Sequence, residues 1–169
     1  MRYWPFALGA AIALADRASK HLVETRLAPW DVIRIVPGYF QIVSTRNTGM
    51  AFSLFDNSAA GHTSPWLIAF TVCVLGIVAW LTWQAVRPGP ATDAPGHWSY
   101  RAALGLILGG AAGNLYDRLF FGTVTDFLDF YWGTAHFPVF NVADSAITCG
   151  AILITANLLF SHAKSKAQV

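Results

Sequence analysis

Four clusters of polar residues stand out in this sequence: three fall near the ends of long apolar segments, and one follows a short β-branched and aromatic run. The clusters are Asp16 and Lys20; Asn47 and Gly49; Asn114, Asp117 and Arg118; and Asn141 and Asp144. Asp16 and Lys20 are four residues apart, so a helix places both on one face, where they can neutralise each other. A charge inside a bilayer costs at least about 2.5 kcal/mol, so ionisable residues in such segments usually mark a site.

The clearest candidate for catalysis is Asp144, the only charged residue in the apolar segment 139–161. Asp126 lies between the last two clusters. If these two carboxyls face each other across a water, repulsion splits their titrations and they share one proton near neutrality. The ionised carboxyl can then deprotonate the water while the protonated one donates to a peptide carbonyl. This is aspartic-protease chemistry, which needs no metal, no other cofactor and no covalent intermediate, although spacing alone does not show that the two residues meet.

The other charged residues are open to a structural interpretation. Asp16 with Lys20 is either part of a site or a snorkelling ion pair near the headgroups. Asp117, beside Arg118, favours a structural partner over a catalyst, and we expect Asp129 to be solvated. The histidines lack the spacing of a zinc site, so no metal is expected.

Composition indicates an integral membrane protein. Of 169 residues, 55% are hydrophobic and 12% are charged, whereas soluble domains carry about 25% charged residues. The net charge of +2, without long runs of one sign, argues against an acidic disordered tail and against a nucleic-acid partner. Both cysteines lie within apolar runs, which indicates neither a disulfide framework nor a thiolate cluster.

Four apolar segments are long enough to span a bilayer as helices, which takes about 20 residues each. They cover about 3–23, 65–86, 98–118 and 139–161, and we assign the whole chain, 1–169, to one integral membrane domain. The third segment is rich in small residues, which let helices approach closely, so we expect it at the centre of the bundle. Four spans put both termini on one side; the basic residues do not decide which, and we expect the cytoplasm.

The segment 30–55 predicts a small β element. Two β-branched and aromatic runs, 32–36 and 39–43, flank Pro37-Gly38, which is typical of a hairpin. The predicted fold is therefore an all-α membrane protein with four transmembrane helices and a small antiparallel sheet outside the membrane. The alternative is a partly apolar loop lying on the bilayer.

The N-terminus allows two interpretations. Arg2, the apolar run 3–15 and Ala13-Leu14-Ala15 resemble a secretory signal with a cleavage site. We expect the first helix to be retained, because Asp16 and Lys20 would have a role in holding the sheet near it.

Several stretches together resemble signal peptidase II, the lipoprotein signal peptidase of bacterial inner membranes. They are Asp16–Lys20, Asn47–Phe52, Gly109–Arg118 with Gly122, Val124, Asp126 and Phe127, and Phe137–Ser145 with Ile147 and Gly150. They occur in the family's order and cover residues 16 to about 150. Asn-x-Gly alone is weak, but the third and fourth stretches are long and specific.

The resemblance implies an aspartyl endopeptidase that removes signal peptides from prolipoproteins, cutting just before a diacylglyceryl-modified cysteine. It also implies four transmembrane helices with a β-sheet cradle, a site towards the periplasmic face of the inner membrane, contact with membrane lipid, and inhibition by globomycin-type compounds. We expect a monomer.

Carried over by position, the resemblance makes Asp126 and Asp144 the catalytic dyad. The supporting polar residues it implies are Asp16, Lys20, Asn47, Gly49, Asn114, Arg118 and Asn141. One departure is Thr125, where the family usually has valine. We expect this β-branched isostere to be tolerated, although its hydroxyl could affect the neighbouring carboxylate.

Two other classes of function account for part of this pattern. A small proton-coupled transporter could use Asp16 and Asp144 as carriers, but it needs acids near the bilayer centre and preferably an internal repeat. A non-catalytic scaffold accounts for the small-residue packing but not for four polar clusters at one depth.

Overall fold

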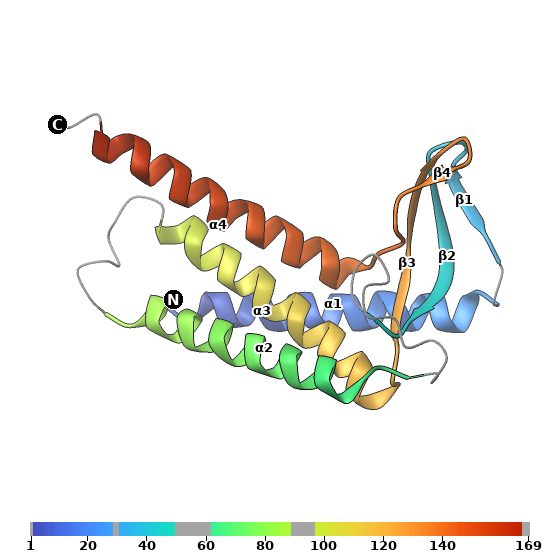
Figure 1. Cartoon of the computed structure of the whole chain (residues 1–169), viewed down its shortest axis with the longest axis horizontal. Helices are drawn as coiled ribbons and strands as arrows, with labels where there is room; N and C mark the ends of the chain where they lie inside the picture. Colours follow the sequence, from blue (N-terminus) through green and yellow to red (C-terminus); the bar gives the residue numbers. More distant parts are fainter. Residues whose placement is uncertain (1, 29–30, 50–61, 89–96, 167–169) are drawn as a thin grey trace.

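Four helices lie alongside one another, and a four-stranded antiparallel sheet stands at one end of them (Figure 1). The computed structural model describes residues 2–28, 31–49, 62–88 and 97–166. The elements are α1 (Trp4–Arg26), β1 (Ile33–Val36), β2 (Phe40–Asn47), α2 (Pro65–Val86), α3 (His97–Phe120), β3 (Val124–Trp132), β4 (Ala135–His136) and α4 (Val142–Lys166). The start of α1 and the end of α4 both lie at the end of the helices away from the sheet (Figure 1).

All four predicted apolar segments are helical, with bounds close to those expected. Two of the described helices are long and apolar enough to cross a membrane by composition: α2, with a mean hydropathy of 2.1, and Val142–Leu159 of α4, with 1.6. The other two carry charged residues. In α1 these include Asp16 and Lys20, which face inward and are fully buried.

Helix α3 is central, as predicted from its small residues, and packs against α1, α2 and α4. Glycines bring the helix backbones together. A Cβ on Gly109 would overlap the carbonyl oxygen of Gly9 in α1, and one on Gly110 would overlap the carbonyl oxygen of Ala143 in α4. The first turn of α4, which holds the predicted catalytic Asp144, is therefore set directly against α3.

The predicted hairpin is confirmed, because β1 pairs antiparallel with β2 through a turn in which Gly38 has a φ of 88°. The prediction that the sheet lies within 30–55 was incomplete. Residues 124–136, where no strand was predicted, supply β3 and β4, and the strand order is β1-β2-β3-β4. Asp126 and Asp129 argue against a strand at these positions in the sequence, because aspartate is depleted in strands. Residues 30 and 50–55 lie outside the described part of the chain.

The expectation that Asp129 is solvated was wrong. The β2–β3 register sets Gln41 opposite Asp129, which is 3% exposed. One carboxylate oxygen accepts a 2.7 Å hydrogen bond from Gln41 Nε2 and lies 2.9 Å from His136 Nδ1. Asp129 is thus a pairing group within the sheet.

The sheet is anchored to the helices by a small apolar core. Val23 and Leu27, near the end of α1, pack against Phe127 of β3. This contact fixes the face of β3 that carries Phe127 against α1. Since successive residues of a strand point to opposite faces, Asp126 points away from that contact.

Candidate active site

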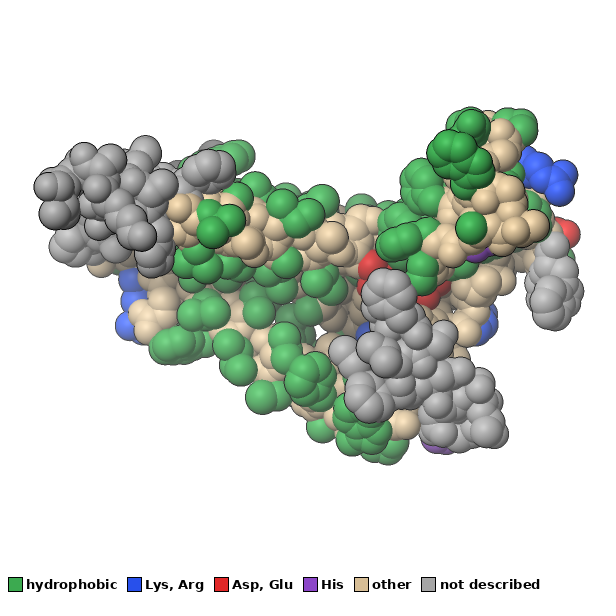
Figure 2. All heavy atoms as spheres, turned by 45° about the horizontal axis from the view of Figure 1, so that its top comes forward, with side chains coloured by type: hydrophobic (Ala, Val, Ile, Leu, Met, Phe, Trp, Pro, Cys, Tyr) green, Lys and Arg blue, Asp and Glu red, His purple; other side chains and the backbone are tan. Residues whose placement is uncertain are grey.

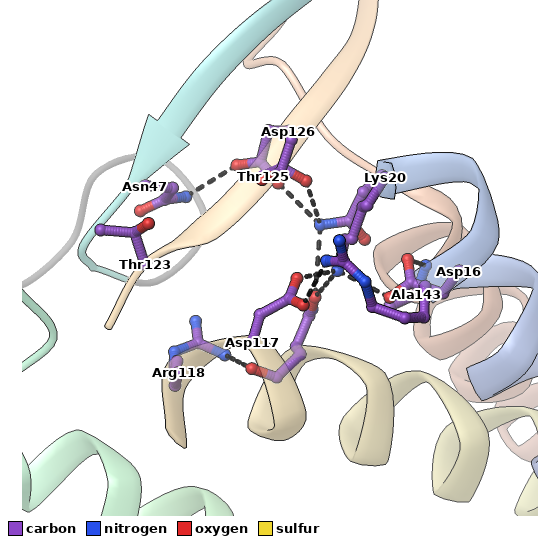
Figure 3. Close-up of polar contacts among 12 residues, drawn as sticks. Asp16, Lys20, Asn47, Asp117, Arg118, Thr123, Thr125, Asp126 and Ala143 are labelled. Atoms are coloured by element: carbon purple, nitrogen blue, oxygen red, sulfur yellow. Dashed lines mark hydrogen bonds and ion pairs between the residues drawn. The ribbon is translucent and has the colours of Figure 1, made fainter. Parts of the chain in front are cut away.

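Asp126 lies on β3 with its carboxylate held by two side-chain amides. Asn47, at the end of β2, donates from Nδ2 to Oδ2 of Asp126 at 2.9 Å. Asn141, just before α4, donates from Nδ2 to Oδ1 at 2.7 Å. Asp126 is 3% exposed, so both carboxylate oxygens have partners inside the protein. Figure 3 shows Asp126 among residues that converge from β2, α1, α3 and the start of α4.

Asp144 belongs to the capping arrangement that begins α4. Asn141 Oδ1 accepts a 2.9 Å hydrogen bond from the Asp144 amide, and Asp144 Oδ2 accepts a 3.3 Å bond from the Asn141 amide. This reciprocal pair has the geometry of a capping box, which stabilises a helix start. The other oxygen of Asp144 accepts a 2.8 Å bond from Asn114 Nδ2. Asn141 therefore contacts both predicted catalytic acids.

Both acids line one cavity of about 740 Å³ between the helices and the sheet. Its polar lining includes Asn47, Asn114, Arg118, Asp126 and Asp144, while Leu67, Phe70, Val74, Phe137, Val139, Phe140 and Ile147 supply apolar walls. Figure 2 shows acidic side chains in the hollow where the helices meet the sheet, beside the mostly hydrophobic surface of the helical part. The arrangement offers a polar floor for a peptide bond and an apolar wall for hydrocarbon.

A buried charge cluster centred on Lys20 lies behind the acids. Lys20 Nζ lies 2.6 Å from Asp16 Oδ2, 2.8 Å from Asp117 Oδ2 and 2.9 Å from Asn114 Oδ1. The predicted pairing of Asp16 with Lys20 is confirmed, and the snorkelling alternative is wrong because Lys20 is fully buried. Asp117 is an ion-pair partner, as expected for a structural role.

The role expected for Asp16 and Lys20, holding the sheet near α1, needs correction. Asp16 Oδ1 accepts a 2.9 Å hydrogen bond from the Ala143 amide in the first turn of α4, and Lys20 reaches Asn114 and Asp117 on α3. The pair thus joins α1 to α3 and α4. The polar link from α1 to the sheet is made by a residue that the sequence reading missed: Glu24, whose Oε1 accepts a 2.6 Å bond from the Thr125 hydroxyl.

Arg118 and Gly49 complete the set of predicted residues. Arg118 donates from Nη2 to the Gly49 carbonyl at 2.9 Å and from Nη1 to the Asn114 carbonyl at 3.3 Å. The Gly49 amide donates to Asn47 Oδ1 at 2.8 Å, which orients the amide that contacts Asp126. All nine predicted site residues therefore belong to one connected region. Residues 50–52 of the second motif lie outside the described part of the chain.

Burial raises the pKa of Asp126 from its ordinary value of 3.8 to about 6. Hydrogen bonds from Asn47 and Asn141 and the charge of Lys20 oppose this rise, while repulsion from Asp144 adds to it. A raised pKa in the folded state means that Asp126 stabilises the fold fully below its ordinary pKa, and that this contribution is lost as the pH rises through about 6.

We therefore expect Asp126→Asn to remove one pH-dependent component of stability. A shift of about 2 pKa units corresponds to about 3 kcal/mol. Denaturant unfolding in detergent, between about pH 4 and about pH 8, should show the free energy of unfolding of the wild type falling relative to that of the variant by up to this amount. A difference between the two proteins that does not vary with pH would contradict the assignment.

Comparison with known proteins connects this geometry to a family. A family model described as signal peptidase (SPase) II matches residues 8–160. A lipoprotein signal peptidase of Solibacter usitatus is 40% identical over 159 residues, which cover 94% of this chain and 92% of that protein. Another, from Shewanella loihica, is 40% identical over 98% of this chain and 90% of its own length.

The fold is also similar to a solved structure. This is a bacterial membrane enzyme determined by the in meso method at 2.3 Å resolution, with a TM-score of 0.75 and 27% sequence identity. The match covers 95% of this chain and 90% of the other chain. The arrangement of helices and sheet is therefore shared over nearly the full length.

Proposed function

Because the chain belongs to the signal peptidase II family and is an aspartic peptidase of the membrane, we propose that it cleaves prolipoproteins immediately before their diacylglyceryl-modified cysteine. The observation that carries the proposal is a single cavity that combines two aspartates with apolar walls. A lipidated precursor needs both features, a hydrolytic centre for the peptide bond and an apolar surface for the signal segment and acyl chains.

In the proposed mechanism, Asp126 and Asp144 activate water without a metal or a covalent intermediate. Asp126 is the better candidate for the proton donor, because burial raises its pKa to about 6 and so favours its protonated form. Asp144 then takes the proton of the attacking water while Asp126 donates to the carbonyl of the scissile bond. When the tetrahedral intermediate collapses, the proton that Asp144 accepted passes to the departing amine, and Asp126 takes back a proton from a hydroxyl of the intermediate as the carbonyl re-forms.

The neighbouring residues fix the positions of Asp126 and Asp144. Asn141 contacts both acids, Asn114 contacts Asp144, and Asn47 contacts Asp126. The Nε of Arg118 has no hydrogen-bond partner among the described residues, although Arg118 lines the cavity and is 9% exposed. We assign it to a carbonyl oxygen of the bound peptide, since a buried donor without a partner is costly and a substrate oxygen would satisfy it.

We propose that all four helices cross the bacterial inner membrane. The charges of α1 that would be costly in lipid are partly or fully buried between the helices, and those of the Lys20 cluster are paired there. The site then lies towards the periplasmic face and both termini lie in the cytoplasm. This is consistent with the start of α1 and the end of α4, which both lie at the end of the helices away from the sheet (Figure 1). The protein acts as a monomer made of one membrane domain that contacts lipid.

Cleavage of a purified diacylglyceryl-precursor peptide by the full-length protein in detergent tests the function. We expect one cut before the lipidated cysteine, inhibition by globomycin, and little or no cut in the same peptide without the diacylglyceryl group. A protein that leaves the lipidated precursor intact, or that cuts both peptides equally, would contradict the proposal.

A further inference from the structure

We propose that Glu24 is a positioning residue for Asp126, acting through the hydroxyl of Thr125. Thr125 and Asp126 are neighbours on β3 and point to opposite faces of the strand. The Asp126 face lines the cavity, whereas the Thr125 hydroxyl donates to Glu24 Oε1 at 2.6 Å. This hydrogen bond therefore restrains β3 from the face opposite the cavity, at the position of the proposed catalytic acid. The inference rests on the proposed dyad.

Glu24 is itself part of a connected series of ion pairs and hydrogen bonds. Arg17, seven residues earlier on α1, forms an ion pair with Glu24 and contacts Asp117 Oδ1 of α3 at 3.1 Å. Asp117 in turn contacts Lys20, which donates to Asn114, the residue that donates to Asp144. This series begins at Thr125, which is next to Asp126 in the sequence, and ends at Asp144.

The substrate cavity is not lined by Glu24, Arg17 or Thr125. Their effect on catalysis is therefore indirect. Thr125 is 1% exposed, so its hydroxyl has no bulk water to replace a lost partner. With the bond present, β3 is held by a polar link at Thr125 in addition to the apolar contact of Phe127 with Val23 and Leu27. The polar link is directional and so fixes the position along the strand, which apolar packing does less well.

The test is Thr125→Val, which keeps the shape of the side chain and removes only the hydroxyl. Since a small misplacement of a catalytic group slows the chemical step, we expect kcat to fall by about 10-fold. KM should remain within about twofold, because the substrate cavity is unchanged. Thr125→Ser keeps the hydroxyl and should restore most of the rate. Thr123→Val is the matched control, because Thr123 lies just before the same strand and, among the described residues, its hydroxyl makes only a long, exposed contact with Arg46 at 3.4 Å.

A second variant tests the partner. Glu24→Leu should lower kcat at least as much as Thr125→Val does, because it removes the bond to Thr125 and also the ion pair with Arg17. The double variant should be no slower than Glu24→Leu alone, because the bond to Thr125 is already lost there. A wild-type kcat in Thr125→Val, an equal fall in Thr123→Val, or additive losses in the double variant would overturn the proposal. These results leave the proposed function intact if the wild type cleaves the lipidated precursor. A wild type that does not cleave overturns the proposed function instead.

Discussion

Cleavage of a lipidated precursor is expected to fall by at least about 10³-fold when Asp126 or Asp144 is replaced by asparagine. Asparagine has nearly the same shape but can neither hold nor give up the proton that the reaction moves. The two losses should not add in the double variant, because two acids that share one proton act as a unit. Single-turnover cleavage of a diacylglyceryl-precursor peptide in detergent measures the effect.

Asp129→Asn is the matched control for this experiment. Asp129 lies on the same strand as Asp126 and is equally buried, but its carboxylate faces Gln41 and His136 and does not line the cavity. It should keep most of the activity. Normal turnover by Asp126→Asn or Asp144→Asn would end the dyad assignment, and complete loss in Asp129→Asn alone would mean that the reacting acid had been misidentified.

Much of the helical architecture could be predicted because it depends on local signals. Apolar length predicts α2, which has no charge, and α4, whose predicted segment has Asp144 as its one charge, and the small residues of α3 predict its central position. The β1–β2 hairpin followed from two β-branched and aromatic runs around Pro37-Gly38. Each signal lies within about 25 neighbouring residues, so a single sequence carries it.

Strand β3 could not be read in the same way. Its polar residues Thr125, Asp126 and Asp129 break the pattern of a half-buried strand, because each is buried by a partner distant in sequence. Gln41 supplies the partner of Asp129 from β2, and Glu24 supplies the partner of Thr125 from α1. The β2–β3 register sets Gln41 beside Asp129, and the packing of α1 on the sheet sets Glu24 beside Thr125. Both are properties of the folded chain and not of the local sequence.

The candidate site was predicted more completely than the strand that carries half of it. The resemblance placed Asp126 and Asp144 together, and the structure brings both to one cavity. The resemblance also implied that Asp16 and Lys20 belong to the site, but their spacing of four residues predicts only that they share a helical face. That spacing did not reveal that Lys20 serves three acceptors, on α1 and α3, and has no exposure to solvent.

That arrangement makes Lys20→Met the substitution with the largest expected effect on stability. Methionine fills a similar volume but leaves the carboxylates of Asp16 and Asp117 buried beside each other, and Asp16 then has no cationic partner among the described residues. Removing one partner of a buried ion pair costs about 3–5 kcal/mol. Activity should fall as well, because Asn114 loses the donor that orients it towards Asp144. Denaturant unfolding in detergent, together with cleavage assays, measures both effects.

The double variant Lys20→Met/Asp16→Asn distinguishes lost charge pairing from lost packing. If unpaired carboxylates cause the instability, neutralising Asp16 removes one of them and should recover part of the loss, so the double variant should be more stable than Lys20→Met alone. The deficit of Lys20→Met should also shrink at low pH, since a protonated carboxyl needs no cation. If packing of the lysine stem dominated, the double variant would be no more stable than the single one and the deficit would not depend on pH. The Lys20 cluster would then contribute only packing between three helices, and its electrostatic link to the proposed catalytic pair would have to be given up.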